Sequence, residues 1–412
     1  MVSKEILCLL MLLLLLGTCR QDQESAFSIT PYPLPVRAGE APSLFYNEQG
    51  EVYASWIEAD SQQSYRFQFS RFEAAGWSEP LLIAEGGRNW FVNWADMPRL
   101  AQYADAPSAL AAFWLERNGR NPYDHHIMIS QSTDGGQTWG AAFMPYEVRT
   151  PAFYGLCRLL PLPDGKMMAV WEDGRETMIE IPHSGRTVPN IHGRISLRAS
   201  QFDKSGKVSD AALLDEMISE LCPFDLAMSS KGPLIVYRNA TEENIRDIAL
   251  IRHENGAWSS PRIISRDKWK VSYFTMQGPA VDAQQSQVAV AWYSAPQNQA
   301  QVKVAFSDDD GDTFSSPVRI DNGQPLGKVD LVLAGRDRVL VSWVEQETDS
   351  ARLFVAAVTT KGRILHKEAI AEVSDKIYAG FPVLATFQDG ALLAWKDGEA
   401  EFSPLKTVLI QQ

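Results

Sequence analysis

The sequence contains few cysteines, no excess of positive charge and no helical periodicity. Only four of its 412 residues are cysteine, too few for the disulfide framework of a small secreted domain. Lysine and arginine number 38 against 51 aspartate and glutamate, which gives a formal net charge of -13. Because nucleic-acid binding needs a basic surface, this charge argues against a nucleic-acid partner. No helix-length amphipathic segment or low-complexity linker interrupts the chain after its first residues, so one domain of β-structure is expected.

The first residues have the pattern of a targeting segment. Lys4 supplies a positive charge, and residues 6–16 form an apolar stretch too short to span a bilayer comfortably. Residues 16–19, ending in Cys19, resemble a bacterial lipobox, in which the cysteine thiol becomes lipidated. Thr18 departs from the usual small residue before the cysteine, so cleavage nearby without lipidation is the alternative.

We therefore expect a signal peptide over residues 1–19 and a short linker over 20–26. The mature protein would be lipid-anchored at the bacterial cell envelope, or extracellular, and monomeric. Two cysteines, Cys157 and Cys222, then remain in the mature chain. They either pair or stay as buried thiols.

A repeated strand pattern runs through the mature sequence. An apolar strand ending in an aromatic residue recurs at intervals of roughly 50 to 65 residues. Each copy is preceded by a second apolar segment and followed by an alternating one, and most units close with an aromatic, a serine and a proline before a fourth strand. Four antiparallel strands per unit indicate the blades of a β-propeller. The aromatic residues that mark the copies are Trp56, Trp114, Trp171, Tyr237, Trp292, Trp343 and Trp395.

The two ends of the chain suggest how the ring closes. The last unit supplies only three strands and ends at residues 406–412, while residues 27–36 precede the first unit as a lone strand. We infer that the N-terminal strand completes the last blade. Seven blades in a single domain over 27–412 is the preferred interpretation, and six blades is the alternative.

Two segments, 132–139 and 307–314, fit the pattern Ser-x-Asp-x-Gly-x-Thr-aromatic, known as the Asp-box. The Asp carboxylate accepts backbone N–H groups across the turn between the third and fourth strands, and Gly permits a positive φ. The pattern indicates a folding element rather than a catalytic site. Its defining residues are Ser132, Asp134, Gly136 and Trp139 in the first copy and Ser307, Asp309, Gly311 and Phe314 in the second.

Ligands of β-propellers usually bind at the face made by the loops that lead into each innermost strand and by the loops joining the second and third strands. We call this the front face and the opposite one the Asp-box face. Arginine, histidine and aromatic residues concentrate in the front-face loops. The catalytic candidates are Asp96, His125, His126, Tyr154, Arg175, His192, Arg238 and Arg246. The substrate-binding candidates are Asn89, Trp90, Trp94, Arg120, Trp269 and Tyr273.

Four histidines fall on front-face loops of two adjacent blades. Together with Asp96 or Asp124 they could bind a divalent metal, or they could act in general acid-base chemistry. No two of them sit at a spacing that a helix or strand would fix, so ordinary hydrogen-bonded loop histidines are the alternative. Ion pairing is the corresponding alternative for the arginines, and packing for the two tryptophans of the first loop. The four histidines are His125, His126, His183 and His192.

The complete Asp-boxes, the repeated blades and residues 89–98 make the chain look like the sialidase-like (BNR, Asp-box) propellers, in particular the bacterial lipoproteins labelled exo-alpha-sialidase. Sialidases bind the substrate carboxylate with three arginines and use an Asp and a Tyr–Glu pair for catalysis. In the segment that resembles the site of the first arginine, this sequence has Glu40. A carboxylate there would repel the substrate by about 4 kcal/mol at an intermediate dielectric. The resemblance therefore argues against true sialidase activity.

Three functions stay open from the sequence. The first is a carbohydrate-active propeller, either glycoside hydrolase-like or a polysaccharide lyase that uses His and Tyr near Arg. The second is a non-catalytic envelope lipoprotein that binds a glycan, a metal or a protein. The third is a structural scaffold, for which no residue pattern speaks.

Overall fold

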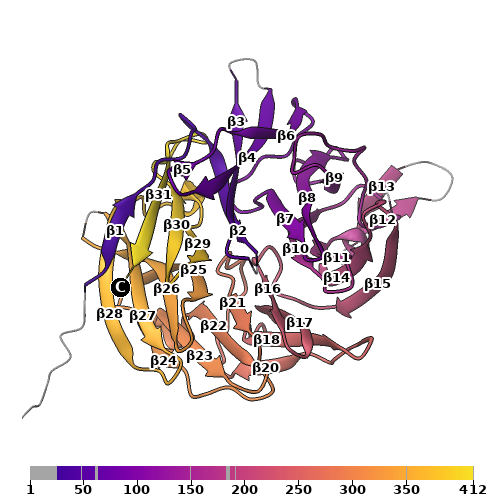
Figure 1. Ribbon diagram of the computed structural model, residues 1–412. Coiled ribbons are helices and arrows are strands. Elements are labelled where there is room, and N and C mark those ends of the chain that lie inside the picture. The colour runs from indigo at the N-terminus through magenta and orange to yellow at the C-terminus, as the bar shows by residue number, and fades with distance from the viewer. Residues whose placement is uncertain are drawn as a thin grey trace, which may run out of the picture.

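The computed structural model describes residues 26–47, 49–60, 64–148, 150–181, 186–190, 192–348 and 350–411. Over these residues the chain forms a β-propeller of seven blades around a central axis (Figure 1). The preferred blade count is therefore confirmed. The expected signal peptide, Cys19 and His183 lie outside the described residues. Among the residues described, no helix is long and apolar enough to cross a membrane.

The first three blades follow one another in chain order. Blade 1 contains β2 (Glu40–Tyr46), β3 (Val52–Ala59), β4 (Tyr65–Glu73) and β6 (Leu81–Gly86), with the short β5 (Gly76–Trp77) beside β4. Blade 2 contains β7 (Arg99–Tyr103), β8 (Ala106–Arg117) and β9 (His125–Ser132), and an isolated bridge from Ile129 to Phe143 stands in for its fourth strand. Blade 3 contains β10 (Tyr154–Pro161), β11 (Met167–Asp173), β14 (Ser196–Phe202) and β15 (Val208–Asp215).

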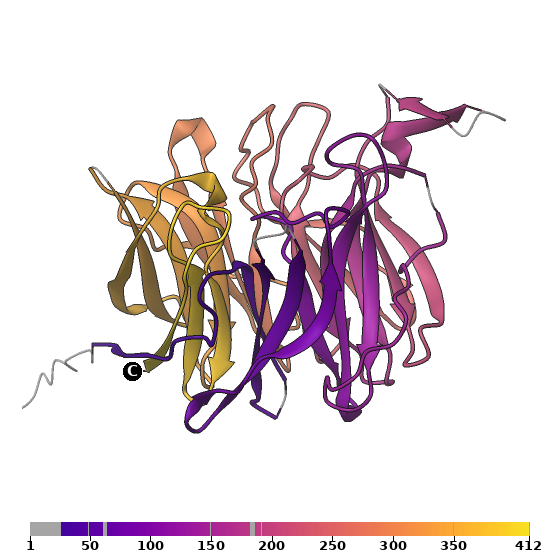
Figure 2. The same ribbon diagram turned by 90° about the horizontal axis from the view of Figure 1, so that it is seen from above.

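A hairpin is inserted into blade 3 between its second and third strands. A 3-10 turn, η1 (Arg175–Thr177), leads into β12 (Met178–Ile181) and β13 (Arg186–Pro189), which pair only with each other. Figure 2 shows this magenta hairpin standing above the loops of the front face, at the top of that view.

The remaining blades complete the ring. Blade 4 contains β16 (Asp225–Ser229), β17 (Gly232–Arg238), β18 (Ile248–Glu254) and β20 (Arg262–Ser265), with β19 (Ala257–Trp258) beside β18. Blade 5 contains β21 (Ala280–Gln284), β22 (Gln287–Ser294), β23 (Gln301–Ser307) and β24 (Val318–Arg319), with η2 (Pro296–Asn298) before β23. Blade 6 contains β25 (Pro325–Leu333), β26 (Arg338–Gln346), β27 (Ala351–Thr359) and β28 (Ile364–Val373), and η3 (Ile377–Ala379) follows it.

The ends of the chain meet in blade 7. Its strands are β29 (Val383–Phe387), β30 (Gly390–Lys396), β31 (Leu405–Gln411) and the N-terminal β1 (Ser28–Pro31). β1 pairs antiparallel with β31, from Ser28 opposite Gln411 to Pro31 opposite Val408. The N-terminal strand thus completes the last blade, as the sequence predicted, and pairs the outer edge of β31.

The aromatic residue at the end of each second strand packs into the core between blades. Trp56, Trp292 and Trp343 have no exposed surface. In several blades the indole N–H donates to an acidic side chain two residues later, for example from Trp171 to Asp173 over 2.7 Å. A Trp-x-acid pattern in the sequence therefore marks the end of a second strand, where the buried indole finds its partner on the same strand.

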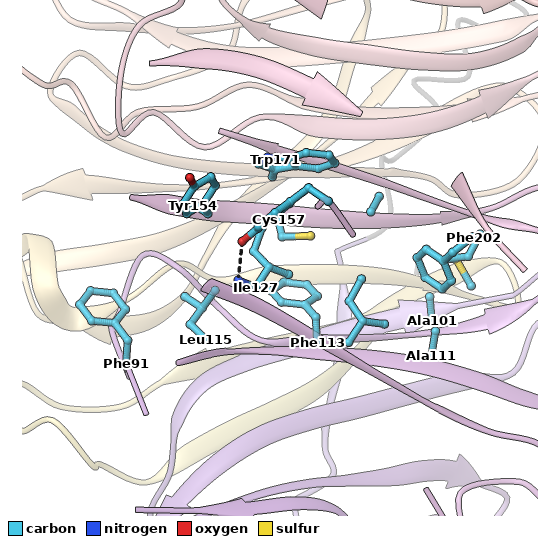
Figure 3. Close-up of a cluster of buried hydrophobic side chains, with 14 of the residues drawn as sticks. Phe91, Ala101, Ala111, Phe113, Leu115, Ile127, Tyr154, Cys157, Trp171 and Phe202 are labelled. Atoms are coloured by element: carbon cyan, nitrogen blue, oxygen red, sulfur yellow. Dashed lines mark hydrogen bonds between the residues drawn. The ribbon is translucent and has the colours of Figure 1, made fainter. Parts of the chain in front are cut away.

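Figure 3 shows the core between blades 2 and 3, where Phe113, Ile127, Cys157 and Trp171 pack together. The dashed line in that view joins the backbone N–H of Ile127 to the hydroxyl of Tyr146, over 3.0 Å. Cys157 is a buried free thiol, and so is Cys222 in blade 4. The sequence left open whether these two cysteines pair, and the structure shows that they do not.

Both Asp-boxes use their acidic residue as a local hydrogen-bond acceptor. Asp134 accepts from the backbone N–H of Thr138 over 2.9 Å and from its hydroxyl over 2.6 Å. Thr138 thereby lowers the pKa of Asp134 to about 2. Gly135 donates its N–H to the carbonyl of Ser108, next to the turn between β7 and β8. Asp309 and Thr313 repeat the arrangement in blade 5.

We expect the N-terminal segment to stabilise the closed ring through its buried apolar side chains. Leu34 is 6% exposed and packs between blades 7 and 1. Leu34→Ala should lower the free energy of unfolding by about 2 to 5 kcal/mol, because removing the buried side chain leaves a cavity in the packed core. Leu82→Ala is the control, since Leu82 is 38% exposed. Equal losses in chemical denaturation of the two variants would contradict the role of Leu34.

Candidate functional site

Asp96 and His125 form a pair that is closed off from solvent. The His125 Nε2 atom lies 3.4 Å from Asp96 Oδ2, and the two side chains are 0% and 5% exposed. The imidazole stacks on Phe91 at 4.2 Å. A Cβ atom at Gly155 would lie 2.1 Å from Asp96 Oδ2, so only glycine fits there. This arrangement packs blade 2 against blade 3 and offers no surface to a substrate.

His126, the next residue, points into a different environment. Its Nδ1 atom lies 3.0 Å from the amide nitrogen of Asn118 and 3.4 Å from the hydroxyl of Tyr146. The ring centroids of His126 and Tyr154 are 5.3 Å apart. The Tyr154 hydroxyl donates to the carbonyl of Thr150 over 3.0 Å. His126 is half-buried rather than sealed, so it is the histidine of this pair that reaches the surface.

Tyr154 is fully buried beneath His126. Burial, followed by the nearby Asp173 carboxylate, raises the pKa of its hydroxyl far above the ordinary value. Tyr154 therefore stays neutral near pH 7 and acts as a platform for its neighbours. Tyr146 stacks on it at 4.7 Å.

Two arginines next to this platform share one buried carboxylate. Arg175 binds Asp173 through two hydrogen bonds of 2.7 and 2.6 Å. Arg198 Nε lies 3.9 Å from the same carboxylate, and the arginine side chains are 19% and 20% exposed while Asp173 is 0% exposed. Glu176 lies 3.8 Å from Arg198 but is 62% exposed, so its charge is well screened by water.

We call His126, Tyr154, Arg175 and Arg198 the blade-3 site. It combines a half-buried imidazole with two guanidinium groups that Asp173 holds in place. Such a pair is suited to bind a carboxylate or sulfate group, because guanidinium binds planar oxyanions through two hydrogen bonds. Burial lowers the pKa of Arg175, but its hydrogen bonds to Asp173 and the charge of that carboxylate raise it by more, so the guanidinium stays charged.

Arg238 and Arg246 lie elsewhere, in blade 4, and bind protein backbone. Arg238 is 1% exposed. It donates to the carbonyls of Gln277 and Tyr293 over 2.8 and 2.6 Å and to that of Arg246 over 2.9 Å. Its guanidinium also lies 4.8 Å from the ring of Trp269, which is buried. Arg246 donates to Val271 and Ser219. Both arginines thus hold the loop that leads into blade 5.

The substrate-binding candidates divide into buried and exposed groups. Trp90 is 4% exposed and stacks on Trp114 at 5.7 Å, so it belongs to the core. Trp94 is half-buried and stacks on Phe381 at 5.9 Å. Asn89 and Arg120 are exposed. The front face also carries exposed large side chains, namely Tyr123 (60%), Tyr273 (68%), Phe274 (54%) and Tyr378 (42%).

The histidines do not converge. His125 is buried, His126 belongs to the blade-3 site, and the backbone N–H of the exposed His192 donates to Asn190 over 3.1 Å. Within the described parts of the chain, no group of three or more His, Cys, Asp or Glu side chains could hold a metal ion.

Glu40, which the sequence resemblance compared with the first sialidase arginine, forms a buried ion pair. Its carboxylate lies 2.5 Å from Lys396 Nζ, and the two side chains are 2% and 1% exposed. Burial raises the pKa of Glu40 despite this partner. The pair links the first strand of blade 1 to the second strand of blade 7. The Glu40 carboxylate is therefore used in a contact between two blades.

The sequence did not single out Tyr146, Asn118 or Arg198. Arg198 lies on β14, two residues after Ser196. From the alternating sequence pattern of this strand, it would be taken for an outward-facing residue. Only the spatial approach of β14 to the end of β11 brings it to Asp173. Tyr146 follows an Asp-box, and its burial could not be told from the surrounding loop sequence.

No protein-family model matches the chain, and the search of curated proteins found no significant relative. Solved structures with the same fold do exist. The polysaccharide lyase Uly1 is 10% identical with a TM-score of 0.53, covering 90% of this chain and 89% of that chain. A PL25 ulvan lyase bound to -[GlcA(1-4)Rha3S]- is 10% identical with a TM-score of 0.51, covering 91% and 93%. The NanB sialidase of Streptococcus pneumoniae has a TM-score of 0.42 at 12% identity, covering 93% and 70%.

These likenesses show the propeller fold, which this chain shares with carbohydrate-active proteins. At such identities they assign no residue of the site.

We expect Arg238 to be needed for folding rather than for ligand binding. Arg238→Leu leaves three buried carbonyls without a donor and should lower the free energy of unfolding by about 2 to 4 kcal/mol. Arg120→Leu, at an exposed position, should change it by less than about 0.5 kcal/mol. The measurement is chemical denaturation followed by tryptophan fluorescence. A stable Arg238→Leu variant would return Arg238 to the ligand-binding candidates.

Proposed function

We propose that this protein binds an acidic polysaccharide at its front face, with the blade-3 site receiving a carboxylate or sulfate group. The observation that carries the proposal is the pair Arg175 and Arg198, both partly exposed and held by one buried carboxylate. Two guanidinium groups around a single carboxylate leave positive charge available to a ligand. Their orientation is set before binding, so little side-chain entropy is lost.

The exposed aromatic side chains of the same face support a carbohydrate ligand. Tyr123, Tyr273 and Tyr378 are each more than 40% exposed. Flat aromatic rings present an apolar surface together with a polar hydroxyl, a combination that suits the alternating faces of sugar rings. Large exposed apolar side chains gathered on one face also indicate a binding surface.

The two lyase structures support the acidic character of the ligand. One of them was solved bound to -[GlcA(1-4)Rha3S]-, which contains a uronate and a sulfate. A ligand of this class fits two arginines better than a neutral glycan would. We further propose that the mature protein acts at the cell envelope, where it encounters polysaccharides, and that a lipid on Cys19 anchors it there. Sialic acid is not proposed as the ligand, because Glu40 and Lys396 pair with each other.

Binding is tested with purified protein, ulvan as the acidic probe and dextran as the neutral one. Ulvan should bind saturably and dextran should not. Arg175→Gln together with Arg198→Gln should weaken ulvan binding at least about tenfold, through the loss of charge-assisted hydrogen bonds. Arg336→Gln, an exposed arginine in the turn between β25 and β26, is the matched control. Equal ulvan binding by the natural protein and all variants would contradict the proposal that the blade-3 site binds the polysaccharide.

A lyase activity is the second candidate, favoured by the half-buried His126 beside the two arginines. In eliminative cleavage, a base removes the proton next to the uronate carboxylate. The bond to the leaving oxygen then breaks, and a carbon–carbon double bond forms. Arg175 and Arg198 would neutralise the carboxylate, while His126 would take the proton from carbon and return it to the leaving oxygen. Tyr154 would position the imidazole, since its own hydroxyl is buried and bound to Thr150.

Lyase activity is measured by the ultraviolet absorbance of the unsaturated uronate that elimination leaves. If the protein is a lyase, ulvan should give this signal, and His126→Ala should lower kcat by about 100-fold or more while ulvan binding persists. Saturable ulvan binding with no product from the natural chain would leave the protein as a non-catalytic binder. His192→Ala, at an exposed histidine, controls for the loss of an imidazole.

A further inference from the structure

A cavity runs along the axis of the ring, away from the blade-3 site. Its volume is about 500 Å³, and the first strands of the blades line it. Asn47, Ala104, Asp105 and Pro163 border it, and all lie in turns between first and second strands. The cavity therefore opens on the Asp-box face. A separate pocket of about 50 Å³ adjoins it toward the front face and is lined by residues that include Pro223, Pro279 and Pro382.

Arg99 points into this cavity, where the charges of Asp225 and Asp330 attract it. Over the described residues, its guanidinium has no hydrogen bond or ion pair, and its buried Nε atom is unsatisfied. Arg158 stands beside it on the next blade, donating to the carbonyl of Cys157 over 3.0 Å. Burial and the like charge of Arg158 lower the pKa of Arg99 to about 9. An unpaired buried cation is costly, and it needs either water or an anion.

The carboxylates of the cavity are already engaged. Asp225, Asp282 and Asp330 each accept a backbone N–H from the following blade, donated respectively by Val281 over 3.0 Å, Leu333 over 2.8 Å and Leu384 over 2.7 Å. Asp282 also accepts the hydroxyl of Tyr46 over 2.6 Å. The nearest of them to Arg158 is Asp225, at 3.9 Å. These carboxylates hold neighbouring blades together. Asp225 and Asp330 attract the charge of Arg99, but among the described residues neither forms an ion pair with it.

We propose that the channel is a binding site for a small organic carboxylate, which enters from the Asp-box face and pairs with Arg99 and Arg158. The volume lies within the range of small-molecule sites, and it is too small for a polysaccharide chain. The site is independent of the proposed polysaccharide binding, because it uses other residues on other strands and opens on the opposite face.

The acids of the channel give the binding a pH dependence. Burial raises the pKa of Asp330 to about 7 and that of Asp282 to about 6. As the pH falls from 8 to 6, protonation removes negative charge facing the arginines, so a carboxylate should bind more tightly. The titratable and charged side chains that line this space are Arg99, Arg158, Asp105, Asp225, Asp282, Asp330, Tyr46 and Tyr103. Of these, Asp330 and Asp282 change charge within that interval.

The experiment is isothermal titration calorimetry of the mature chain with glucuronate and succinate, using glucose and succinamide as neutral counterparts. At least one carboxylate should bind with one-to-one stoichiometry, more tightly at pH 6 than at pH 8, and its neutral counterpart should not bind. Arg99→Gln and Arg158→Gln should each weaken binding at least about tenfold. Arg266→Gln, at an exposed arginine that does not line the cavity, should leave it unchanged. No saturable heat with either carboxylate overturns the proposal.

Stability separates a binding role from a structural one. Arg99→Gln should keep or raise the thermal midpoint of the free protein, because it removes an unpaired buried cation. Met228→Trp is the second variant, since Met228 lines the cavity and a larger side chain would obstruct it without changing its charge. Carboxylate binding that survives both variants contradicts the channel site. Ulvan binding should persist in both, so failure of the channel site is distinguishable from failure of the proposed function.

Discussion

The fold depends on satisfying the backbone N–H groups of each blade's first strand. These strands face the channel and cannot complete a ladder on that side, and an unsatisfied buried N–H is costly. In blades 3, 5, 6 and 7 an aspartate of the preceding blade accepts such a group, as Asp96 does from Leu156 over 2.8 Å. Glu172 accepts the N–H of Leu221, in the loop that leads into blade 4, over 2.8 Å. From blade 2 to blade 7, each blade is thereby fixed to the next by a carboxylate.

The same constraint explains the strained residues near the front face. Leu156 and Leu221 have φ angles of 49° and 54°, in the left-handed region that side chains with a Cβ rarely adopt. The carboxylates of Asp96 and Glu172 bind the N–H groups of these two residues. Burial raises the pKa of Glu172 well above its ordinary value. The local strain is held by contacts from a neighbouring blade, so the loops that carry the candidate residues are rigidly placed.

The fold could be predicted from the sequence because its signals are local. The strand ending in Trp, the closing turn and the Asp-box each depend on residues within about ten positions, and the lone N-terminal strand required a partner. The candidate site depends on contacts between blades, which local patterns do not record. Trp90 and Arg238 looked like loop residues available to a ligand, yet both are buried by segments that are distant in sequence. The sequence did not single out Arg99, because only the closed ring brings the first strands to one axis.

The arginines of this protein form a series by how completely the protein satisfies them. Arg238 donates to three carbonyls and is 1% exposed, so a ligand would have nothing to add. Arg175 is bound to Asp173 but stays 19% exposed, which leaves room for a ligand at a guanidinium whose orientation is already set. Arg99 faces a cavity and, among the described residues, has no hydrogen bond or ion pair, only the charge attraction of Asp225 and Asp330. Each missing partner leaves a charge that an anion can stabilise. The stabilisation gained from a bound anion should therefore increase along this series from Arg238 to Arg99.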